Sequence, residues 1–397
     1  MPQHQFTRRR ALWLGLAALT GLGTSTVART ITTAQTALRN SPAASLDKLA
    51  RQTQVTGEES LRQRAKAKGL IYGAAARRAN LFTDPALAKA YQAECGILVP
   101  EWELKWSSGD ARLRPTLQTF DFSRSDWMLR FAQSNDMQMR GHVLVWHLGL
   151  PDWFEEQVNR QNAEQVLVRH IQTVAGHYAG KLHSWDVVNE AIEPNNRRAD
   201  GLRITSWLQL LGPDYLDLAF RAAAAADPQA KLTYNDYGLE YDRPDHEARR
   251  RAVLKLLEQL KAQGTPIHAF GLQAHLEGHE TRFNPNKLRR FLADVASLGL
   301  EIYITELDVI DNRLPRHPTN RDRLIAQAYE DFLTVALDEP AVKLIVTWGL
   351  SDRYTWLSDF HPRSDRAAVR PLLLDANLNR KLAWHAVARA IDQAPSR

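Results

Sequence analysis

The apolar residues of this chain follow two alternating spacings. Eight short runs are rich in β-branched residues and are bounded by Gly, Pro or polar residues, which is typical of buried strands. These runs cover residues 70–74, 97–101, 139–146, 185–190, 231–237, 270–275, 301–308 and 343–350. Between them, apolar residues recur every three to four positions, which predicts amphipathic helices. The clearest helical segments cover residues 163–178, 215–226, 246–262, 284–298, 321–337 and 382–391.

The alternation of strand and helix predicts an α/β fold. The strand starts lie roughly 25–50 residues apart, the size of a βα unit with its loops. Because each parallel strand needs a crossover, eight such units favour a closed (β/α)8 TIM barrel. An open doubly wound sheet is the alternative, but its marker, a G-x-G-x-x-G turn after the first strand, is absent. We expect a single catalytic domain over residues 61–397.

The first 28 residues have the features of an export signal. Arg8, Arg9 and Arg10 precede an apolar stretch rich in Gly, Ala and Leu, and small residues follow at 26–28, as in a signal peptide. The arginine pair is typical of a twin-arginine signal. A membrane anchor is the alternative, but the apolar stretch is shorter than the ~20 residues that a bilayer requires.

We therefore expect residues 1–28 to be a twin-arginine-type signal peptide and the twin-arginine export machinery to be a partner. The mature protein would be exported, periplasmic or extracellular, with no stable membrane association after cleavage. Residues 29–60 are rich in Ala, Thr, Gln and Ser and are interpreted as a linker or N-terminal extension.

Composition narrows the class of protein further. The 397 residues are 44% hydrophobic and 24% charged, an ordinary globular mixture. Three of the 51 Lys and Arg residues and none of the 45 Asp and Glu residues lie in the first 28, so the remainder carries +3 instead of +6. No basic run is interleaved with aromatic residues, so we expect no nucleic-acid partner. Cys95 is the only cysteine, which excludes an intramolecular disulfide.

The barrel prediction places candidate chemistry at one end of the molecule. Catalytic groups of such barrels lie at the carboxyl ends of the strands, and two glutamates, Glu190 and Glu306, each follow an apolar β-rich run. Either one alone could be a solvated or ion-paired carboxylate. As a pair at one barrel mouth they suit cleavage of a glycosidic bond, which needs an acid for the leaving oxygen and a second carboxylate facing the anomeric carbon.

Neighbouring side chains support different roles for the two glutamates. Asn189 can bind a sugar hydroxyl beside the reacting carbon, whereas His275 and Asp308 can form a polar chain that orients and ionises Glu306. Indoles at or after strand ends suit the flat apolar faces of sugar rings, although core packing is the alternative for each. These indoles belong to Trp106, Trp146, Trp348 and Trp356.

Metal and cofactor chemistry is not expected. His275 and His279 lie four positions apart, but no further ligands accompany them, and a zinc site needs three or four. The sequence also contains no phosphate-binding loop, no H-E-x-x-H and no G-x-S-x-G.

Five segments together resemble the signature segments of glycoside hydrolase family 10. They are Gly-His-Val-Leu-Val-Trp-His at 141–147, Trp-Asp-Val-Val-Asn-Glu-Ala at 185–191, Tyr-Asn-Asp-Tyr at 234–237, Gly-Leu-Gln-Ala-His-Leu at 271–276 and Ile-Thr-Glu-Leu-Asp-Val at 304–309. The resemblance covers about residues 65–392 in the expected order. It implies a (β/α)8 endo-1,4-β-xylanase that hydrolyses internal bonds of xylan by a retaining double displacement.

The resemblance also implies roles for individual residues. Glu190 matches the acid/base and Glu306 the nucleophile, and Asp308 matches the partner of His275. Glu101 and Lys105 match residues that hold the next sugar on the non-reducing side. The remaining substrate-binding residues implied in this way are His142, Trp146, Asn235, Tyr237, Gln273, Trp348 and Trp356, with Asn189 and His275 beside the sugar at the cleavage point.

The chain departs from the family pattern at a few positions. Trp102 replaces the Asn that usually follows the glutamate of strand two, which removes a hydroxyl-binding amide and adds bulk. Gly238 and Gln118 also stand where Asn and Gly are usual. One alternative function is therefore a retaining barrel glycosidase acting on short xylo-oligosaccharides or on another β-1,4-glycan. Another is a catalytically silent carbohydrate-binding barrel.

Overall fold

The structure is a computed structural model that describes residues 55–397. The predicted signal segment, residues 1–28, and most of the predicted linker, residues 29–60, lie outside the described residues. Within the described part, the first helix is α2 (Leu61–Ala67), which begins at a capping box formed by Ser60 and Gln63.

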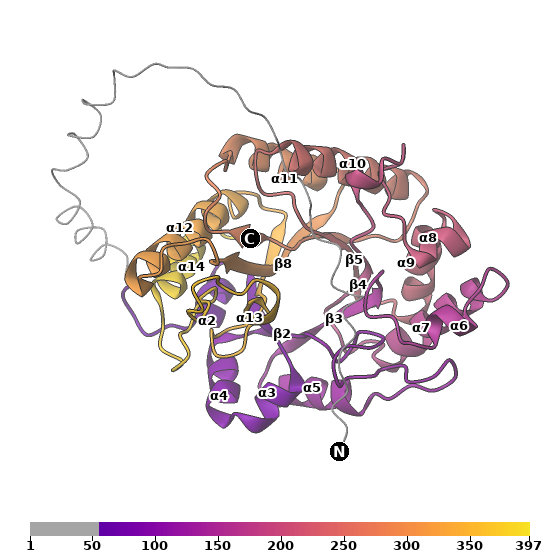
Figure 1. Ribbon diagram of the computed structural model, residues 1–397, viewed down its shortest axis with the longest axis horizontal. Coiled ribbons are helices and arrows are strands. Elements are labelled where there is room, and N and C mark those ends of the chain that lie inside the picture. Colours follow the sequence, from indigo (N-terminus) through magenta and orange to yellow (C-terminus); the bar gives the residue numbers. More distant parts are fainter. Residues whose placement is uncertain (1–54) are drawn as a thin grey trace. The chain divides into compact units, whose positions relative to one another are not determined.

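Eight parallel strand positions close into a barrel, as predicted (Figure 1). Neighbouring strands pair in sequence order, β1 pairs with β9, and β6 pairs with β8 to complete the ring. The strands are β1 (Ile71–Ala76), β2 (Ile97–Pro100), β3 (Gln138–Val145), β4 (Ser184–Asn189), β5 (Lys231–Asp236), β6 (Ala269–Leu272), β7 (His275–Glu277), β8 (Glu301–Ile310) and β9 (Val342–Thr347).

The sixth barrel strand is divided, which the sequence pattern did not predict. The run 270–275 was expected to be one strand, but β6 ends at Leu272 and β7 pairs only with β8. Between them, Ala274 has a φ of 60°, a left-handed conformation that breaks the ladder. Gln273 lies in this break, and His275 is the first residue of β7.

Helices surround the barrel and cover its outer surface (Figure 1). Three of the long ones begin with proline at the first helical position, where the missing N–H has no partner to lose. The helices that follow α2 are α3 (Arg78–Thr83), α4 (Pro85–Glu94), α5 (Ser123–Gln133), α6 (Phe154–Gln157), α7 (Ala163–His177), α8 (Ser206–Leu211), α9 (Tyr215–Ala226), α10 (Pro244–Ala262), α11 (Pro285–Ser297), α12 (Pro318–Ala336), α13 (Leu357–Phe360) and α14 (Leu382–Gln393), with a 3-10 turn at Pro194–Asn196.

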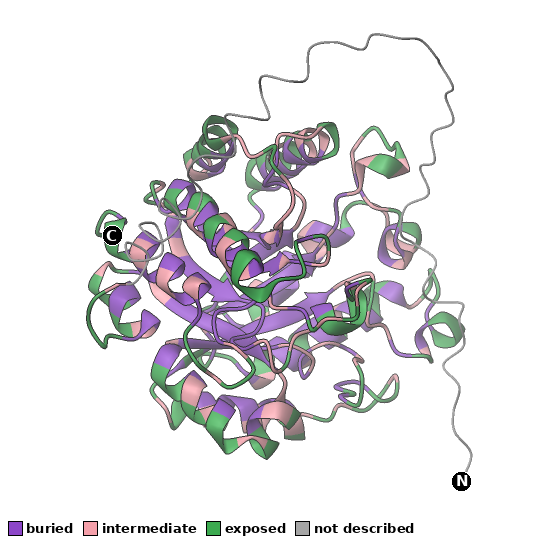
Figure 2. Cartoon of the chain, turned by 60° about the vertical axis from the view of Figure 1, so that its left-hand side comes forward, coloured by how far each residue is buried: buried purple, intermediate pink, exposed green. Residues whose placement is uncertain are grey.

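The buried residues lie in two layers, with the strands at the centre (Figure 2). A small cluster fills the barrel interior, and a larger one lies between the strands and the helices. Cys95 is buried in the larger cluster. Gly141 allows the Trp185 ring to lie against β3, because a Cβ there would come within 2.1 Å of the indole. Among residues 55–397, no helix is long and apolar enough to cross a membrane.

Candidate active site

A chain of amide side chains links the two candidate carboxylates. Glu190 follows β4 directly, and Glu306 lies within β8. Asn189 donates to Oε1 of Glu190 at 3.1 Å, and Asn235 donates through Nδ2 to Oδ1 of Asn189 at 2.9 Å and to Oε1 of Glu306 at 2.8 Å. The end of β5 thus supplies the group that joins the acidic residues of β4 and β8.

Gln273 strengthens this link from the break between β6 and β7. Its Nε2 donates to Oε1 of Glu190 at 3.0 Å and to Oδ1 of Asn189 at 3.2 Å. Its backbone carbonyl accepts the N–H of Glu306 at 2.9 Å. A single residue therefore contacts both candidate catalytic segments, through its side chain on one side and its backbone on the other.

Glu306 is buried and held by a chain of polar groups. Nε2 of His275 lies 3.3 Å from Oε2 of Glu306, and Nδ1 of the same ring lies 2.9 Å from Asp308. The indole of Trp356 donates to the other oxygen of Asp308 at 2.7 Å. The polar chain expected from the sequence is therefore present, and Trp356 extends it.

The charges around Glu306 favour its ionised form. Burial alone would raise its pKa, but the hydrogen bond from His275 and the positive charges of His142, His275 and Lys105 outweigh burial and lower the pKa to about 2. Burial similarly opposes protonation of His275, and the carboxylates of Asp308 and Glu306 outweigh it, so its pKa is raised well above the usual value. At neutral pH the site presents an ionised carboxylate beside an imidazolium.

Glu190 has a different environment. Its backbone is left-handed, with a φ of 57°, and its carbonyl accepts a hydrogen bond from Nε of Arg203 at 2.8 Å. Nδ1 of His147 lies 3.9 Å from Oε2 of Glu190, and burial lowers the pKa of His147 to about 4. The imidazole nearest Glu190 is therefore neutral at neutral pH, where Glu306 is ionised.

Tyr237 lies beside this segment, at the end of β5. Its hydroxyl accepts a hydrogen bond from Nη2 of Arg203 at 2.9 Å, and the guanidinium of Arg249 lies 4.4 Å from the centre of its ring. Tyr237, predicted to bind substrate, also fixes the arginine that holds Glu190.

The remaining predicted binding residues cluster at the ends of β2, β3 and β9. The His142 ring meets the edge of Trp348 at 5.2 Å. Nζ of Lys105 lies 5.0 Å from the ring centre of Trp146 and 5.8 Å from that of Trp348. Burial lowers the pKa of Lys105, although the carboxylates of Glu101, Glu306 and Glu190 oppose this shift. Cationic and aromatic groups thus face the acidic pair.

Glu101 is held in an ion pair. Nε and Nη2 of Arg77 donate to one oxygen of Glu101 at 2.9 and 2.7 Å. The same guanidinium lies 3.7 Å from the ring centre of Trp102. Arg77 therefore contacts both Glu101, the predicted sugar-binding carboxylate, and Trp102, which stands in place of the usual Asn. We call these three residues the Arg77–Trp102–Glu101 unit.

Of the two interpretations considered for Trp106, sugar binding and core packing, the structure shows core packing. Its side chain is buried, its indole donates to the carbonyl of Leu144 at 2.7 Å, and it stacks on His170 at 3.7 Å. Core packing, the alternative considered for each indole, holds at this position because the side chain points between the barrel and the helices.

Three further residues of the site were not predicted. His147 had a detectable signal, because it lies two residues after the end of β3, whereas Arg203 lies thirteen residues beyond Glu190 in a segment with no motif. Asp186 lies inside β4, binds Nδ1 of His142 at 2.9 Å and pairs with Arg140. Its position in an apolar run gave no indication that it orients a site residue.

Residues 55–397 contain no group of three or more His, Cys, Asp and Glu side chains arranged to hold a metal ion. Nε2 of His279, the second histidine of the pair considered above, accepts a hydrogen bond from Nη1 of Arg313 at 3.0 Å. Two carboxylates are linked in the site: Glu306, which is ionised, and Glu190, which lies beside the amide groups of Asn189 and Gln273.

A closed barrel with two carboxylates linked by hydrogen bonds, one directly after β4 and one within β8, defines a barrel hydrolase of the two-carboxylate class. The family model described as glycosyl hydrolase family 10 matches residues 60–390. The chain belongs to glycosyl hydrolase family 10.

Named relatives and solved structures agree with this family. The chain is 34% identical over 330 residues to beta-1,4-xylanase of Dictyoglomus thermophilum, covering 80% of this chain and 87% of that protein. It is 35% identical over 300 residues to endo-1,4-beta-xylanase C of Paenibacillus barcinonensis, covering 69% of this chain but only 27% of that longer protein. For endo-1,4-beta-xylanase 1 of Humicola insolens, the match covers 66% of that protein.

The fold also matches a crystal structure of xylanase 10B from Thermotoga petrophila RKU-1 in complex with xylobiose. The TM-score is 0.76 at 32% identity, over 85% of this chain and 99% of that one. Native xylanase 10B from Thermotoga maritima gives a TM-score of 0.75 at 33% identity, over 84% and 98% of the two chains.

Proposed function

We propose that this chain is an endo-1,4-β-xylanase that hydrolyses internal β-1,4-xylosidic bonds with retention of configuration. The observation that carries the proposal is the hydrogen-bonded link from Glu190 through Asn189 and Asn235 to Glu306. The named relatives are xylanases, and one structural neighbour binds xylobiose, which supports xylan or xylo-oligosaccharide as the substrate.

In the first step, Glu306 is the nucleophile. Its ionised carboxylate attacks the anomeric carbon, and the bond from that carbon to the leaving oxygen breaks as Glu190 donates its proton to that oxygen. The shortened sugar leaves as an alcohol, and the remaining sugar is held as an ester of Glu306. Such direct attack requires the two carboxyl groups to lie about 5–5.5 Å apart.

In the second step, Glu190 is the base. It removes a proton from water, the resulting hydroxide attacks the anomeric carbon, and the ester bond to Glu306 breaks. Glu306 regains its negative charge and Glu190 its proton. Two inversions at one carbon give net retention, and the atoms balance as one water consumed for each bond cut.

The other predicted residues position the substrate in this scheme. Asn189, His142 and Gln273 would bind hydroxyls of the sugar at the cleavage point. Trp348 and Trp356 offer flat apolar surfaces to its ring. Glu101 and Lys105 would hold the preceding sugar, and Trp146, Asn235 and Tyr237 complete the set of proposed binding residues.

Two variants test the roles of the glutamates. Glu306→Ala should abolish release of sugar from both xylohexaose and an aryl xylobioside, because no ester can form. Glu190→Ala should lower kcat on xylohexaose by about 10²–10⁴-fold, the usual contribution of a general acid. It should slow the first step on the aryl substrate far less, because a good leaving group needs no proton.

Proton NMR of the first product supplies the stereochemical readout. Retention predicts the β-anomer initially, and initial formation of the α-anomer would contradict the mechanism. Failure of the wild type to release any sugar would favour the silent carbohydrate-binding barrel, and equal losses for both substrates in Glu190→Ala would contradict its role as the acid.

The Arg77–Trp102–Glu101 unit favours a second candidate, an enzyme that acts on short xylo-oligosaccharides or another β-1,4-glycan. The bulk of Trp102 and the Arg77 ion pair restrict the region where the preceding sugar would bind. Initial rates on xylan, cellulose and xylohexaose separate these substrates. An endo-xylanase predicts a rapid fall in xylan chain length before monomer accumulates.

We also propose export through the twin-arginine machinery, on the basis of the arginine run before the apolar stretch. Replacing Arg8, Arg9 and Arg10 with lysine should leave the protein in the cytoplasm. Fractionation of cells by immunoblot tests this proposal, and unchanged export of the triple variant would contradict it.

A further inference from the structure

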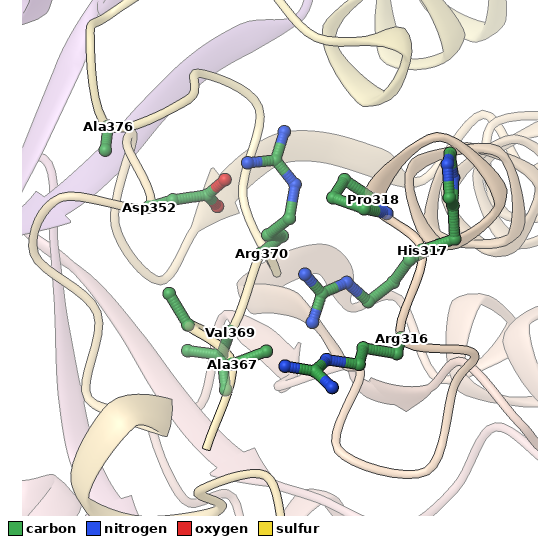
Figure 3. Close-up of a pocket in the computed structure, with 10 residues that line it drawn as sticks. Arg316, His317, Pro318, Asp352, Ala367, Val369, Arg370 and Ala376 are labelled. Carbon is green, nitrogen blue, oxygen red and sulfur yellow. The ribbon is translucent and has the colours of Figure 1, made fainter. Parts of the chain in front are cut away.

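A cavity of about 670 Å³ lies between the segment that enters α12 and the segment that follows β9 (Figure 3). Its buried charges are paired within the protein: Arg321 lies 3.3 Å from Asp311, and Arg370 and Asp352 each form an ion pair with a neighbouring side chain. Arg316, which also lines the cavity, is exposed. These features indicate no particular ligand, whereas the aromatic side chains of α3 and α5 form a more specific surface.

Three aromatic side chains follow one another across α3 and α5, which lie side by side (Figure 1). The ring of Phe82 meets the ring of Trp127 edge-on, with 5.9 Å between their centres. The rings of Trp127 and Phe131 are 5.4 Å apart and only 12° from parallel. Phe82 is 57% exposed, and the other two side chains are partly exposed. We call these three residues the aromatic row, because they offer solvent a run of apolar surface longer than one ring.

The aromatic row carries a free hydrogen-bond donor and a cation. Within residues 55–397, the indole N–H of Trp127 has no hydrogen-bond partner, and it is not buried. The guanidinium of Arg78 lies 4.3 Å from the ring centre of Phe82 and 5.5 Å from that of Trp127, which holds the two rings in place. Apolar rings with a free donor beside them suit a sugar chain, because each sugar has apolar faces and a rim of hydroxyls.

A buried carboxylate joins the aromatic row to the region beside Glu101. Glu103 accepts the backbone N–H of Arg78 through Oε1 at 2.6 Å and the backbone N–H of Trp102 through Oε2 at 3.3 Å. Of the two consecutive arginines, Arg77 contacts Trp102 and Glu101, whereas Arg78 contacts the aromatic row. The aromatic row therefore continues a surface that begins at the Arg77–Trp102–Glu101 unit.

The loop after β2 makes a second connection between the same two regions. Gly109 lies against the ring of Trp102, because a Cβ at this position would come within 2.3 Å of the indole. The next residue, Asp110, forms an ion pair with Arg124, which lies one turn before Trp127 on α5. Both sides of the surface between Trp102 and the aromatic row are thus fixed by the fold.

We propose that the aromatic row is a second binding site for a β-1,4-linked glycan chain, outside the cleft that contains Glu190 and Glu306. The rings pack against the faces of neighbouring sugars, and the indole N–H of Trp127 donates to a hydroxyl. The choice of xylan as the particular glycan rests on the proposed function. Because the row continues from the unit beside Glu101, a chain held there is kept close to the cleft.

The size of the aromatic row favours a glycan chain over a second copy of this protein. Among residues 78–133, Phe82 is the only large apolar side chain that is exposed, and charged groups border the row. A stable protein interface buries roughly 800 Å² on each partner, which is far more than three rings supply. A chain one sugar wide needs no larger surface than the row itself.

Binding to insoluble xylan tests the proposal, with the full chain carrying Glu306→Ala so that the polymer is not cut. Adding Phe82→Ala or Trp127→Ala should weaken binding at least about fivefold, because a polymer held at two sites binds more tightly than at either alone. Leu324→Ala removes an exposed apolar side chain from α12 and is the matched control, with unchanged binding. Full binding by both aromatic variants would overturn the proposal.

Hydrolysis of an aryl xylobioside reports on the cleft alone, because this substrate is too short to extend beyond it. In the chain that retains Glu306, Phe82→Ala and Trp127→Ala should cut the aryl substrate at the wild-type rate, whereas KM for long xylan should rise several-fold. Equal losses on both substrates would place the effect in the cleft and overturn the proposal. Thermal unfolding checks the partly buried Trp127, and the exposed Phe82 decides the question if Trp127→Ala does not fold.

Two further measurements exclude other occupants of the aromatic row. Granular starch, an α-1,4-linked glycan, should not retain the protein, and retention through Phe82 as strong as that on xylan would overturn the choice of a β-1,4-linked chain. Sedimentation of the wild type and of Phe82→Ala should give the same mass. A dimer that Phe82→Ala dissociates would assign the row to a second copy and overturn the proposal.

Hydrolysis of xylohexaose separates this proposal from the proposed function. A wild type that binds insoluble xylan through Phe82 but cuts neither xylohexaose nor xylan would uphold the second site and overturn the proposed function. A wild type that cuts both substrates but binds xylan equally well without Phe82 and Trp127 would do the opposite.

Discussion

His275 lies 3.3 Å from Glu306, and it carries the positive charge that keeps this carboxylate ionised. The arrangement is reciprocal, because Glu306 and Asp308 together hold the proton on His275. Loss of the imidazole should therefore change how Glu306 titrates as well as how it is oriented.

His275→Asn should move the acid limb of the kcat/KM profile to higher pH. The nucleophile must be ionised, and its pKa of about 2 depends on the hydrogen bond and charge of His275. Removing these favours the protonated form, so the pKa of Glu306 rises and activity is lost at a higher pH as acid is added. Rates measured from pH 2.5 to 7 report the shift.

His279→Asn is the matched control for this prediction. His279 follows the same strand but contacts Arg313 and Glu277 instead of Glu306. The acid limb of the pH profile of His279→Asn should coincide with that of the wild type. If the acid limb of His275→Asn also coincided with that of the wild type, the imidazolium would not control the ionisation of Glu306.

Asn235→Ala should lower kcat/KM on xylohexaose by about 10–100-fold. The substitution removes the donor to both Asn189 and Glu306, and a hydrogen bond to a charged group contributes about 1.5–3 kcal/mol. Asn377→Ala, in an exposed turn, is the control and should be neutral. Steady-state rates measure the difference, and a loss below twofold would exclude a positioning role for Asn235.

Arg77→Ala should raise KM for xylohexaose several-fold, with little change in kcat. The guanidinium orders Glu101 and covers Trp102, and neither residue contacts Glu190 or Glu306 through a hydrogen bond. A change confined to KM indicates lost ground-state binding. The exposed Arg112 provides a control variant, Arg112→Ala, with wild-type kinetics. A fall in kcat with unchanged KM would place Arg77 in the chemical step instead.

Asp186→Asn should destabilise the fold by about 3–5 kcal/mol, the usual cost of removing one partner of a buried ion pair. Asp186 is buried with Arg140 and also fixes His142. Asp110→Asn breaks the exposed pair with Arg124 and should cost less than about 1 kcal/mol. Urea denaturation of both variants measures the free energy of unfolding, and equal effects would contradict the assignment of Asp186 to a buried network.

The barrel and its carboxylate pair were predictable because strand periodicity and strand-end chemistry are local properties of the sequence. The helix 215–226 coincides with α9. The predicted helix starts at 246 and 321 are too late. In the structure, α10 begins at Pro244 and α12 begins at Pro318.

Features that depend on long-range packing were not predictable. The division of the sixth strand rests on one left-handed residue, Ala274, which has no marker in the sequence. Trp106 follows a strand end just as Trp146 does, yet only the packing of α7 against the barrel decides that its ring stacks on His170. Arg203 reaches Glu190 from a loop whose path the sequence pattern does not define.

The backbone at the two glutamates differs in a way that matters to a protein engineer. Glu190 stands at a left-handed position, where a residue with a Cβ is disfavoured by roughly 1–2 kcal/mol. Glycine introduced there relieves that penalty. Glu306 lies in the middle of β8, where glycine weakens a strand. For an inactive variant used in synthesis or ligand capture, we therefore expect glycine at Glu190 to preserve the stability of the fold better than glycine at Glu306.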